Sequence, residues 1–375
     1  MSLMWLQVGQ CGNQIGQEWW QILANNGAEA DRYPYFSRDG LINAICVDSE
    51  PKVIRRLRQQ VKKGQFRDAN IILGQRGRGN NWAYGKKRGG PTKPGVLLER
   101  TMESFRKELE RRDCYSGTVI LHSLCGGTGS GLGSRLCQEI RDNYPAGHLL
   151  SVTTAPHETG DTPLQHYNSL LCLSYLQRWE LMWEEHISVQ PPMGRAYTSG
   201  DTIIKRHFYT LIRNLCSPVL VHISTLKIGH SPCSGCDGYF RFFSFNTFSQ
   251  HHSLSVLAVA RNSQEYSFLL SRDSVLMKLK QSYHCVSWNP FPIQCWTDPQ
   301  NILDPSSNSH SLTVCANHSS AGDLVSGIVG KSHTMYNAGG YLHWYRRYGC
   351  EDEDFQAAFN TLDSVVEEYN SLGQQ

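Results

Sequence analysis

The most informative stretch of this sequence is TVILHSLCGGTGSGLGS, residues 118–134, in which an apolar run passes directly into a loop rich in glycine. The run has the length and composition of a buried strand, and Leu132, Leu136 and Ile140 then recur at the spacing of one helix face. Glycine lets backbone N–H groups approach an anion closely, and a helix start favours negative charge. This unit predicts a phosphate-binding α/β fold.

The same order of strand, loop and helix recurs along the first half of the chain. Glycine-containing loops are expected at 9–16 and 77–85, an amphipathic helix at 98–111, and Asp48 and Glu50 come just after a strand. The strand-like runs are 3–8, 41–47, 71–73, 118–124 and 148–152. Such repeated units predict a doubly wound parallel sheet whose loops converge at the carboxyl ends of the strands.

The pattern changes beyond about residue 215. Strand-like runs at 217–223, 254–260 and 311–318 are separated by polar loops, which predicts a second, mixed domain. Apolar residues then keep helical spacing over 355–369, and acidic residues precede them, as is typical of the start of an amphipathic helix.

Composition excludes several classes of protein. With 375 residues and 40% apolar residues, the chain can fill two cores, and it contains no apolar run long enough for a membrane span and no secretory signal. The 13 cysteines lack the density of a small secreted domain, which favours the cytoplasm. A formal net charge of +3 is too small to predict nucleic-acid binding. Neither nucleic acid nor membrane insertion is expected.

Several motifs resemble, in order, the nucleotide loops of the tubulin family. They are GQCGNQIG (9–16), DSEP (48–51), GNNWAYG (79–85), GGTGSG (126–131) and HYNSLL (166–171), and near the other end SWNPF (287–291) and HWYRRYG with EDEDF (343–355). GSGLGS and NNWAYG are most similar to the delta, epsilon and zeta branches. The family's fold implies a Rossmann-like parallel sheet GTPase domain, a mixed α+β second domain and C-terminal helices. The corresponding ranges are 1–170 for the nucleotide-binding GTPase domain, 171–215 for a shortened connecting region, 216–318 for the intermediate α+β domain and 319–375 for the helices.

The resemblance also implies the ligands, GTP or GDP with Mg²⁺. Glu50 matches the acid that holds magnesium through water, with Asp48 beside it; Asp161 matches an aspartate that reaches the ribose, and Tyr197 an aromatic residue that stacks on guanine. The family positions around the phosphates are occupied by Gln10, Cys11, Asn80, Ser123, Gly126, Gly127, Thr128 and Gly129, and the position of Asn80 is the one near the terminal phosphate. Cys125 replaces a family glycine, so phosphate binding is expected to be retained better than base specificity.

Hydrolysis in the family is completed by an acid from the next subunit, and Thr210 stands at that acid's position here. A hydroxyl cannot replace a carboxylate in orienting water. The resemblance therefore implies, at most, a weak GTPase that depends on subunit contact. It implies other tubulins or microtubule and centriolar proteins as partners, and a location in the cytoskeleton, at the centriole or the basal body of a cilium.

Two other functions fit parts of the pattern. A Rossmann-type enzyme would use the glycine loops for a dinucleotide, although G-x-G-x-x-G is broken at Leu132 and Ser134 and Asp48 lies too far beyond Gly16. A degenerate scaffold would bind no nucleotide and would act through its helical surfaces alone.

Overall fold

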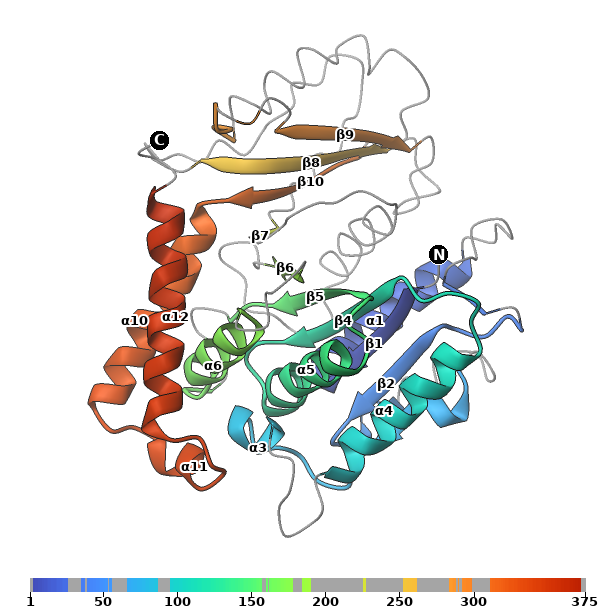
Figure 1. Cartoon of the computed structure of the whole chain (residues 1–375), viewed down its shortest axis with the longest axis horizontal. Coiled ribbons are helices and arrows are strands. Elements are labelled where there is room, and N and C mark those ends of the chain that lie inside the picture. The colour runs from blue at the N-terminus through green and yellow to red at the C-terminus, as the bar shows by residue number, and fades with distance from the viewer. Residues whose placement is uncertain are drawn as a thin grey trace. The chain divides into compact units, whose positions relative to one another are not determined.

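The chain, in a computed structural model, divides into two compact units (Figure 1). The first comprises Met1–His186, Pro191–Ala196 and Val325–Ser364, and the second comprises Ile187–Gln190, Tyr197–Leu324 and Val365–Gln375. The structure describes residues 3–25, 35–37, 39–52, 54–55, 66–86, 95–156, 160, 162–177, 184–189, 225–226, 252–261, 283–287, 289, 292–298 and 311–371. The boundaries at 170, 215 and 318 stay a prediction.

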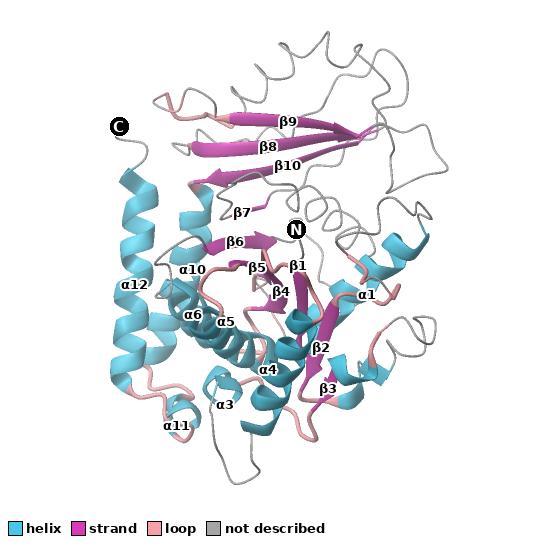
Figure 2. Ribbon diagram, turned by 45° about the vertical axis from the view of Figure 1, so that its right-hand side comes forward, coloured by secondary structure: helices cyan, strands magenta, loops and turns pink. Residues whose placement is uncertain are grey.

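A five-stranded parallel sheet forms the core of the first unit, in the order β3–β2–β1–β4–β5 (Figure 2). The strands are β1 (Leu3–Val8), β2 (Ala44–Asp48), β3 (Ile71–Leu73), β4 (Gly117–Ser123) and β5 (His148–Thr154). Each lies within three residues of its limits in the sequence pattern. Val8 pairs with Val47 and Asp48 with Leu73, so the strands end along one carboxyl edge.

Helices cover both faces of this sheet. The helix α1 (Gly9–Asn25) lies on one face, and α4 (Gly95–Glu110) and α5 (Gly133–Asn143) lie on the other (Figure 1). The chain runs outward from β1 to β3 and then returns across β1 to β4, and right-handed crossovers in opposite directions place helices on opposite faces. A 3₁₀ turn (Asp68–Asn70) precedes β3, and α6 (Gln165–Gln177) follows β5. The predicted doubly wound sheet is confirmed.

An aromatic cluster anchors α1 to the sheet. Trp5 of β1 packs against Trp19 and Trp20 of α1, with ring centroids 4.9 and 5.8 Å apart, and Tyr35 closes the cluster. All four side chains are buried. Rings of this size contribute much of the apolar area that a core removes from water.

The expected glycine loops are wrong in three places. β1 passes directly into α1, because Gly9 takes φ +73° and turns the chain at once. Residues 128–132 form a π-helix that continues into α5. A short helix, α3 (Trp82–Lys86), occupies part of the third loop because the Asn81 side-chain oxygen caps it, accepting the N–H of Tyr84 at 3.0 Å. The glycine motifs therefore stand at helix starts.

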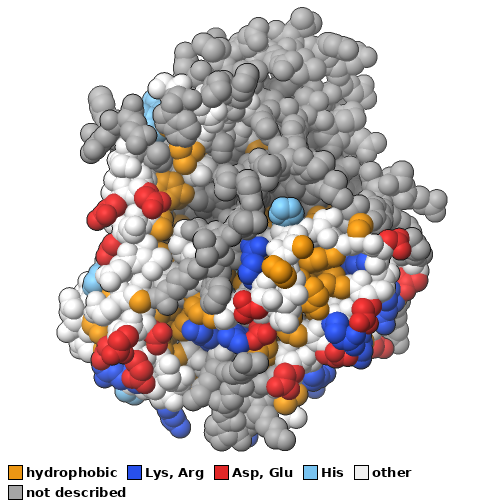
Figure 3. All heavy atoms as spheres, viewed as in Figure 1, with side chains coloured by type: hydrophobic (Ala, Val, Ile, Leu, Met, Phe, Trp, Pro, Cys, Tyr) orange, Lys and Arg blue, Asp and Glu red, His pale blue; other side chains and the backbone are white. Residues whose placement is uncertain are grey.

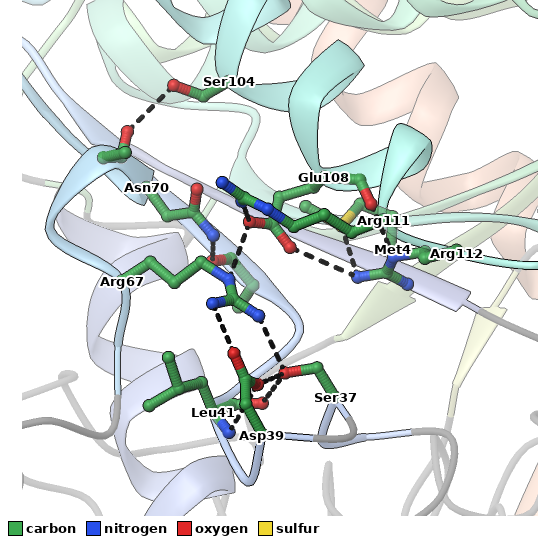
Figure 4. Close-up of polar contacts among 12 residues, drawn as sticks. Met4, Ser37, Asp39, Leu41, Arg67, Asn70, Ser104, Glu108, Arg111 and Arg112 are labelled. Carbon is green, nitrogen blue, oxygen red and sulfur yellow. Dashed lines mark hydrogen bonds and ion pairs between the residues drawn. The ribbon is translucent and has the colours of Figure 1, made fainter.

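An ion network with a buried centre lies at the amino edge of the sheet (Figure 4). Its centre is Glu108 of α4, whose side chain is 2% exposed and which pairs with Arg67 at 2.9 Å. Arg112 also donates to the carbonyl of Leu3, the first residue of β1, at 2.8 Å. We call Asp39, Arg67, Glu108, Arg111 and Arg112 the amino-edge network.

The outer surface of α4 carries charge differently. Glu103, Arg106 and Glu110 form ion pairs one helical turn apart, and their side chains are about half exposed. On the face drawn in Figure 3, acidic and basic side chains are interspersed over the described part of the first unit. Such exposed pairs contribute little to stability.

The second unit contains the mixed sheet that the sequence predicts. The strand β8 (Ser253–Arg261) pairs in parallel with β9 (Ile293–Asp298) and antiparallel with β10 (Ser311–His318). β10 also pairs antiparallel with β7 (Thr225–Leu226), which pairs in parallel with the end of β6 (Glu184–Val189). The expected run at 217–223 lies outside the described residues.

Three helices follow β10: α10 (Ser320–Asn337), α11 (Leu342–Arg346) and α12 (Asp352–Ser371). The predicted terminal helix is confirmed as α12, and its first turn carries three acidic residues that favour the helix dipole. His333 of α10 stacks on Phe359 of α12 with ring centroids 3.7 Å apart. None of the described helices has the length and apolar character needed to cross a membrane.

Candidate nucleotide-binding site

Three segments that follow β1, β3 and β4 meet at the carboxyl edge of the five-stranded sheet. A Cβ atom on Gly9 would lie 2.9 Å from the backbone nitrogen of Gly129, and one on Gly127 would lie 2.7 Å from that of Asn81. Real Cβ atoms do not come this close to backbone, so only glycine permits the approach. The result is a surface built mainly from main-chain groups.

Gly126 is the open position in this surface. A Cβ atom there would meet no atom of the described residues within 4 Å, whereas Gly127 and Gly129 are tightly packed. The residue stands just before the helical stretch of 128–143, where backbone N–H groups lack partners within the helix and the dipole favours an anion. A phosphate group fits the space and the polarity at Gly126.

Two carboxylates stand beside these segments. Asp48 is 3% exposed, and one of its oxygens, Oδ1, accepts the N–H of Glu50 at 3.1 Å. Its other oxygen, Oδ2, is buried and has no hydrogen-bond partner among the described residues. Burial raises the pKa of Asp48 to about 6, opposed by the N–H of Glu50 and assisted by the negative charge of Glu50. A buried, unpaired carboxylate oxygen is costly unless a ligand satisfies it.

Glu50 is exposed, and its carboxylate lies against the segment after β3: a Cβ atom on Gly77 would be 2.0 Å from its Oε1. Within the described residues there is no group of three or more His, Cys, Asp or Glu side chains placed to hold a metal. Mg²⁺ in nucleotide sites takes one or two carboxylates and completes its shell with phosphate oxygens and water. Asp48 and Glu50 fit that requirement.

Hydroxyl groups connect the acid pair to the glycine-rich segment. The side-chain oxygens of Ser49 and Thr128 are 2.6 Å apart and share a hydrogen bond. At the end of β4, the Ser123 hydroxyl accepts the N–H of Cys125 at 3.1 Å. Burial raises the pKa of Cys125 to about 11, so this thiol stays protonated near neutral pH.

Asn80 lies at the tip of a tight turn beside Gly127. Gly79 and Asn80 both have positive φ, +56° and +49°, and the N–H of Asn81 closes the turn on the carbonyl of Arg78 at 3.1 Å. Asparagine tolerates this left-handed region better than most residues. The turn holds the exposed Asn80 side chain at the rim of the site.

Asn168 of α6 ties these segments together, and we did not identify it from the sequence as a site residue. Its Nδ2 donates to the carbonyls of Asn80 and Cys125, both at 2.7 Å, and its Oδ1 accepts the N–H of Trp82 at 2.8 Å. The residue is fully buried within a helix buried nearly all round. That signal, a polar amide in an apolar helix, was present in HYNSLL.

Arg78 is a second residue that sequence reasoning missed. It is 8% exposed, its guanidinium carbon lies 5.0 Å from the centre of the Tyr84 ring, and its Nε is buried without a partner among the described residues. The Cβ atom of Arg78 would lie 3.0 Å from a Cβ atom placed on Gly127. A positive charge is therefore built in next to the glycine-rich segment.

The remaining candidates fall into two groups. Gln10 is exposed in the first turn of α1, and the half-buried Cys11 beside it has its sulfur 3.2 Å from the hydroxyl of Thr154 at the end of β5. Both stand at the carboxyl edge with Asp48, Ser123 and the glycines. Asp161, Tyr197 and Thr210 lie outside the described residues.

Comparisons with known proteins match this architecture. The family model described as "Tubulin/FtsZ family, GTPase domain" matches residues 2–179, which span β1 to α6. The chain is 26% identical to the tubulin beta chain, nucleomorph, of Guillardia theta over 432 residues, 98% of this chain and 95% of the relative. It is 25% identical to the tubulin delta chain of Homo sapiens over 457 residues, 99% of this chain and all of the relative.

Both alignments are longer than the 375 residues of the chain, so both relatives contain residues that have no counterpart here. The matches extend over the parallel sheet, the mixed sheet and the terminal helices. The chain is a divergent member of the tubulin superfamily.

Proposed function

We propose that this chain binds GTP or GDP together with Mg²⁺ at the carboxyl edge of its parallel sheet, and that it is a structural protein of microtubule-based assemblies. One observation carries the proposal: open, glycine-backed main chain at Gly126 stands at the same edge as a buried Asp48 oxygen without a partner among the described residues. Backbone N–H donors bind the phosphates of a triphosphate, and carboxylates bind its magnesium ion.

Each residue has a role in this proposal. The main chain of Gly126, Gly127 and Gly129, with Thr128, surrounds phosphate, and Gln10, Cys11, Asn80 and Ser123 complete the rim. Asp48 and Glu50 hold the cation, Glu50 through water. Asp161 binds ribose and Tyr197 stacks on the base. Bound GTP supplies a terminal phosphate whose presence or loss distinguishes two states of the site.

The position of Thr210 leads to a proposal about turnover. Threonine offers no carboxylate to orient water on a neighbouring subunit's nucleotide, so we propose that this chain binds nucleotide but does not stimulate its neighbour. Any GTPase activity is then weak and depends on subunit contact. Stimulated phosphate release when the chain is mixed with a GTP-loaded tubulin, lost on Thr210→Ala, would contradict this.

We also propose other tubulins or centriolar proteins as partners, and the cytoskeleton of the cytoplasm, at the centriole or basal body, as the location. Beta and delta chains match at nearly the same identity, 26% and 25%, so the choice of branch rests on the motifs GSGLGS and NNWAYG. Tagging the full chain and imaging it beside a centriole marker tests the location; a signal spread evenly through the cytoplasm would contradict it.

The ligand is tested by denaturing the purified protein and identifying the nucleotide it releases. The proposal expects close to one GTP or GDP per chain, and much less from Asp48→Asn. Release of a dinucleotide such as NAD would instead support a Rossmann-type enzyme. Release of no nucleotide, from folded protein prepared with Mg²⁺, would support a scaffold that has lost the ligand.

A further inference from the structure

Tyr345 of α11 reaches the centre of the candidate site from a distant part of the sequence. Its ring is fully buried, and its hydroxyl donates to Oδ1 of Asn168 at 2.8 Å across 177 residues of sequence. The same hydroxyl lies 3.5 Å from the carbonyl oxygen of Leu164. Burial holds the pKa of Tyr345 well above its usual range, so the hydroxyl keeps its proton.

This bond completes the hydrogen bonding of the Asn168 amide. Two carbonyls accept from its nitrogen, those of Asn80 and Cys125, and two donors, the N–H of Trp82 and the hydroxyl of Tyr345, bond to its oxygen. An amide has two donors and one oxygen with two lone pairs, so no capacity is left over. The orientation of the amide, and with it the position of both carbonyls, is thereby fixed.

A neighbouring tyrosine provides the contrast. Tyr167 is equally buried, and its ring packs edge-on against Tyr345 and Phe355 with centroids 5.4 and 5.0 Å apart. Its hydroxyl has no hydrogen-bond partner among the described residues. Two buried tyrosines thus share one aromatic cluster, and only Tyr345 is bonded to Asn168.

From these contacts we infer that Tyr345 is a positioning residue for nucleotide binding: through Asn168 it holds the segments of Asn80 and Cys125 in the form that receives the phosphates. The inference rests on the proposed function, since it takes a guanine nucleotide as the ligand. The hydrogen bonds of Tyr345 in the described structure run to Asn168 and Leu164 and to neither segment, so its effect passes through Asn168. The turn at Asn80 matches the family's position near the terminal phosphate, so GTP should be affected more than GDP.

The test is Tyr345→Phe in the full chain, which removes one oxygen and keeps the ring. Loss of one buried hydrogen bond should weaken GTP binding by about 3- to 10-fold, measured by titration with Mg²⁺·GTP, with a smaller loss for Mg²⁺·GDP. Tyr167→Phe, the matched control, should leave both affinities within about twofold, because its hydroxyl makes no bond in the described structure.

A second control separates positioning from general loosening. Phe359→Leu disturbs the stack on His333 in the same helical region without touching Asn168, and should lower the thermal midpoint while keeping the ratio of GTP to GDP affinity. Unchanged affinity in Tyr345→Phe, or an equal loss in all three variants, would overturn the inference. Failure of the unaltered protein to bind either nucleotide would overturn the proposed function itself and this inference with it.

Discussion

At the amino edge of the parallel sheet Glu108 lies among three arginines, whereas at the carboxyl edge Asp48 is as deeply buried but has one oxygen unpartnered within the described residues. The pKa values of two aspartates, one at each edge, shift in opposite directions. At the amino edge Arg67 lowers the pKa of Asp39 to about 2, and at the carboxyl edge burial raises the pKa of Asp48 to about 6. One edge satisfies its charges within the chain, and the other leaves them for a ligand.

This comparison separates the charges that stabilise the fold from the charges that are available to bind a ligand. Removing a charge from the amino-edge network should cost stability and leave nucleotide affinity unchanged. Removing Asp48 should do the reverse, because a buried acid with one oxygen unpartnered in the described structure destabilises the empty fold. Changes of opposite sign in stability would distinguish the two kinds of charge better than a loss of activity alone.

The largest effect is expected from Glu108→Gln, which removes the buried carboxylate that Arg67 and Arg112 share and leaves Arg67 only its pair with the half-exposed Asp39. Removing one partner of a buried ion network costs about 3 kcal/mol of unfolding free energy, measured by urea denaturation. Glu103→Gln on the exposed face of α4 is the control and should change stability little. A comparable loss in both variants would show that burial of Glu108 does not matter.

The second effect has the opposite sign. Asp48→Asn removes the cost of an ionised buried acid, so at pH 7.5 the nucleotide-free protein should gain about 2 kcal/mol in unfolding free energy. Its affinity for Mg²⁺·GTP should fall by about tenfold or more. Destabilisation of the empty protein, measured in the same urea series, would contradict an unsatisfied Asp48.

The pH dependence of stability should distinguish the two edges. The folded pKa of Asp48, about 6, lies above its ordinary 3.8, so the folded state holds the proton more tightly. Its stabilising contribution is full below about pH 4 and is lost as pH rises past 6, and the total loss is about 2–3 kcal/mol. Asp39 does the reverse: its contribution is present above about pH 4 and is lost as pH falls towards 2.

These trends are measured as the difference in unfolding free energy between the unaltered protein and each variant, Asp48→Asn or Asp39→Asn, over a pH series. The unfolding free energy of the unaltered protein, relative to that of Asp48→Asn, should decrease from pH 4 to 7. Relative to that of Asp39→Asn, it should increase from pH 2 to 4. If neither difference in unfolding free energy changed with pH, the proposed electrostatic contrast between the two edges would be wrong.

The smallest effect concerns Glu50. Gly77→Ala places a methyl group where the Glu50 carboxylate now lies, and because that side chain is exposed and can move, stability should change by under about 0.5 kcal/mol. Affinity for Mg²⁺·GTP should still fall about threefold, with no loss when Mg²⁺ is absent. At Gly79, φ +56° makes Gly79→Ala cost about 1 kcal/mol of stability instead.

The sequence predicted the sheet well because its signals are local. Apolar runs such as 3–8 and 118–124 each correspond to one buried strand. The polar residue Asp48 marks the end of the strand β2. The glycine segments were placed correctly but read as loops. The start of α3 depends on the side-chain oxygen of Asn81, which accepts the N–H of Tyr84, and apolar periodicity does not encode such a cap.

The rest depends on contacts between distant residues. Glu108 looks like any charge on an amphipathic helix, and only the fold brings Arg67 and the start of β1 to it. Asn168 receives Tyr345 from 177 residues away. No periodicity encodes such partners, whereas a polar residue within an apolar helix at least indicates that one must exist.

The central claim is most directly tested by calorimetric titration of nucleotide-free, folded protein with GTP, with Mg²⁺ and with a chelator in its place. One GTP site per chain is expected, with tighter binding when Mg²⁺ is present and no effect of Mg²⁺ in Asp48→Asn. Absence of binding at millimolar GTP, or binding that ignores both Mg²⁺ and Asp48, would contradict it.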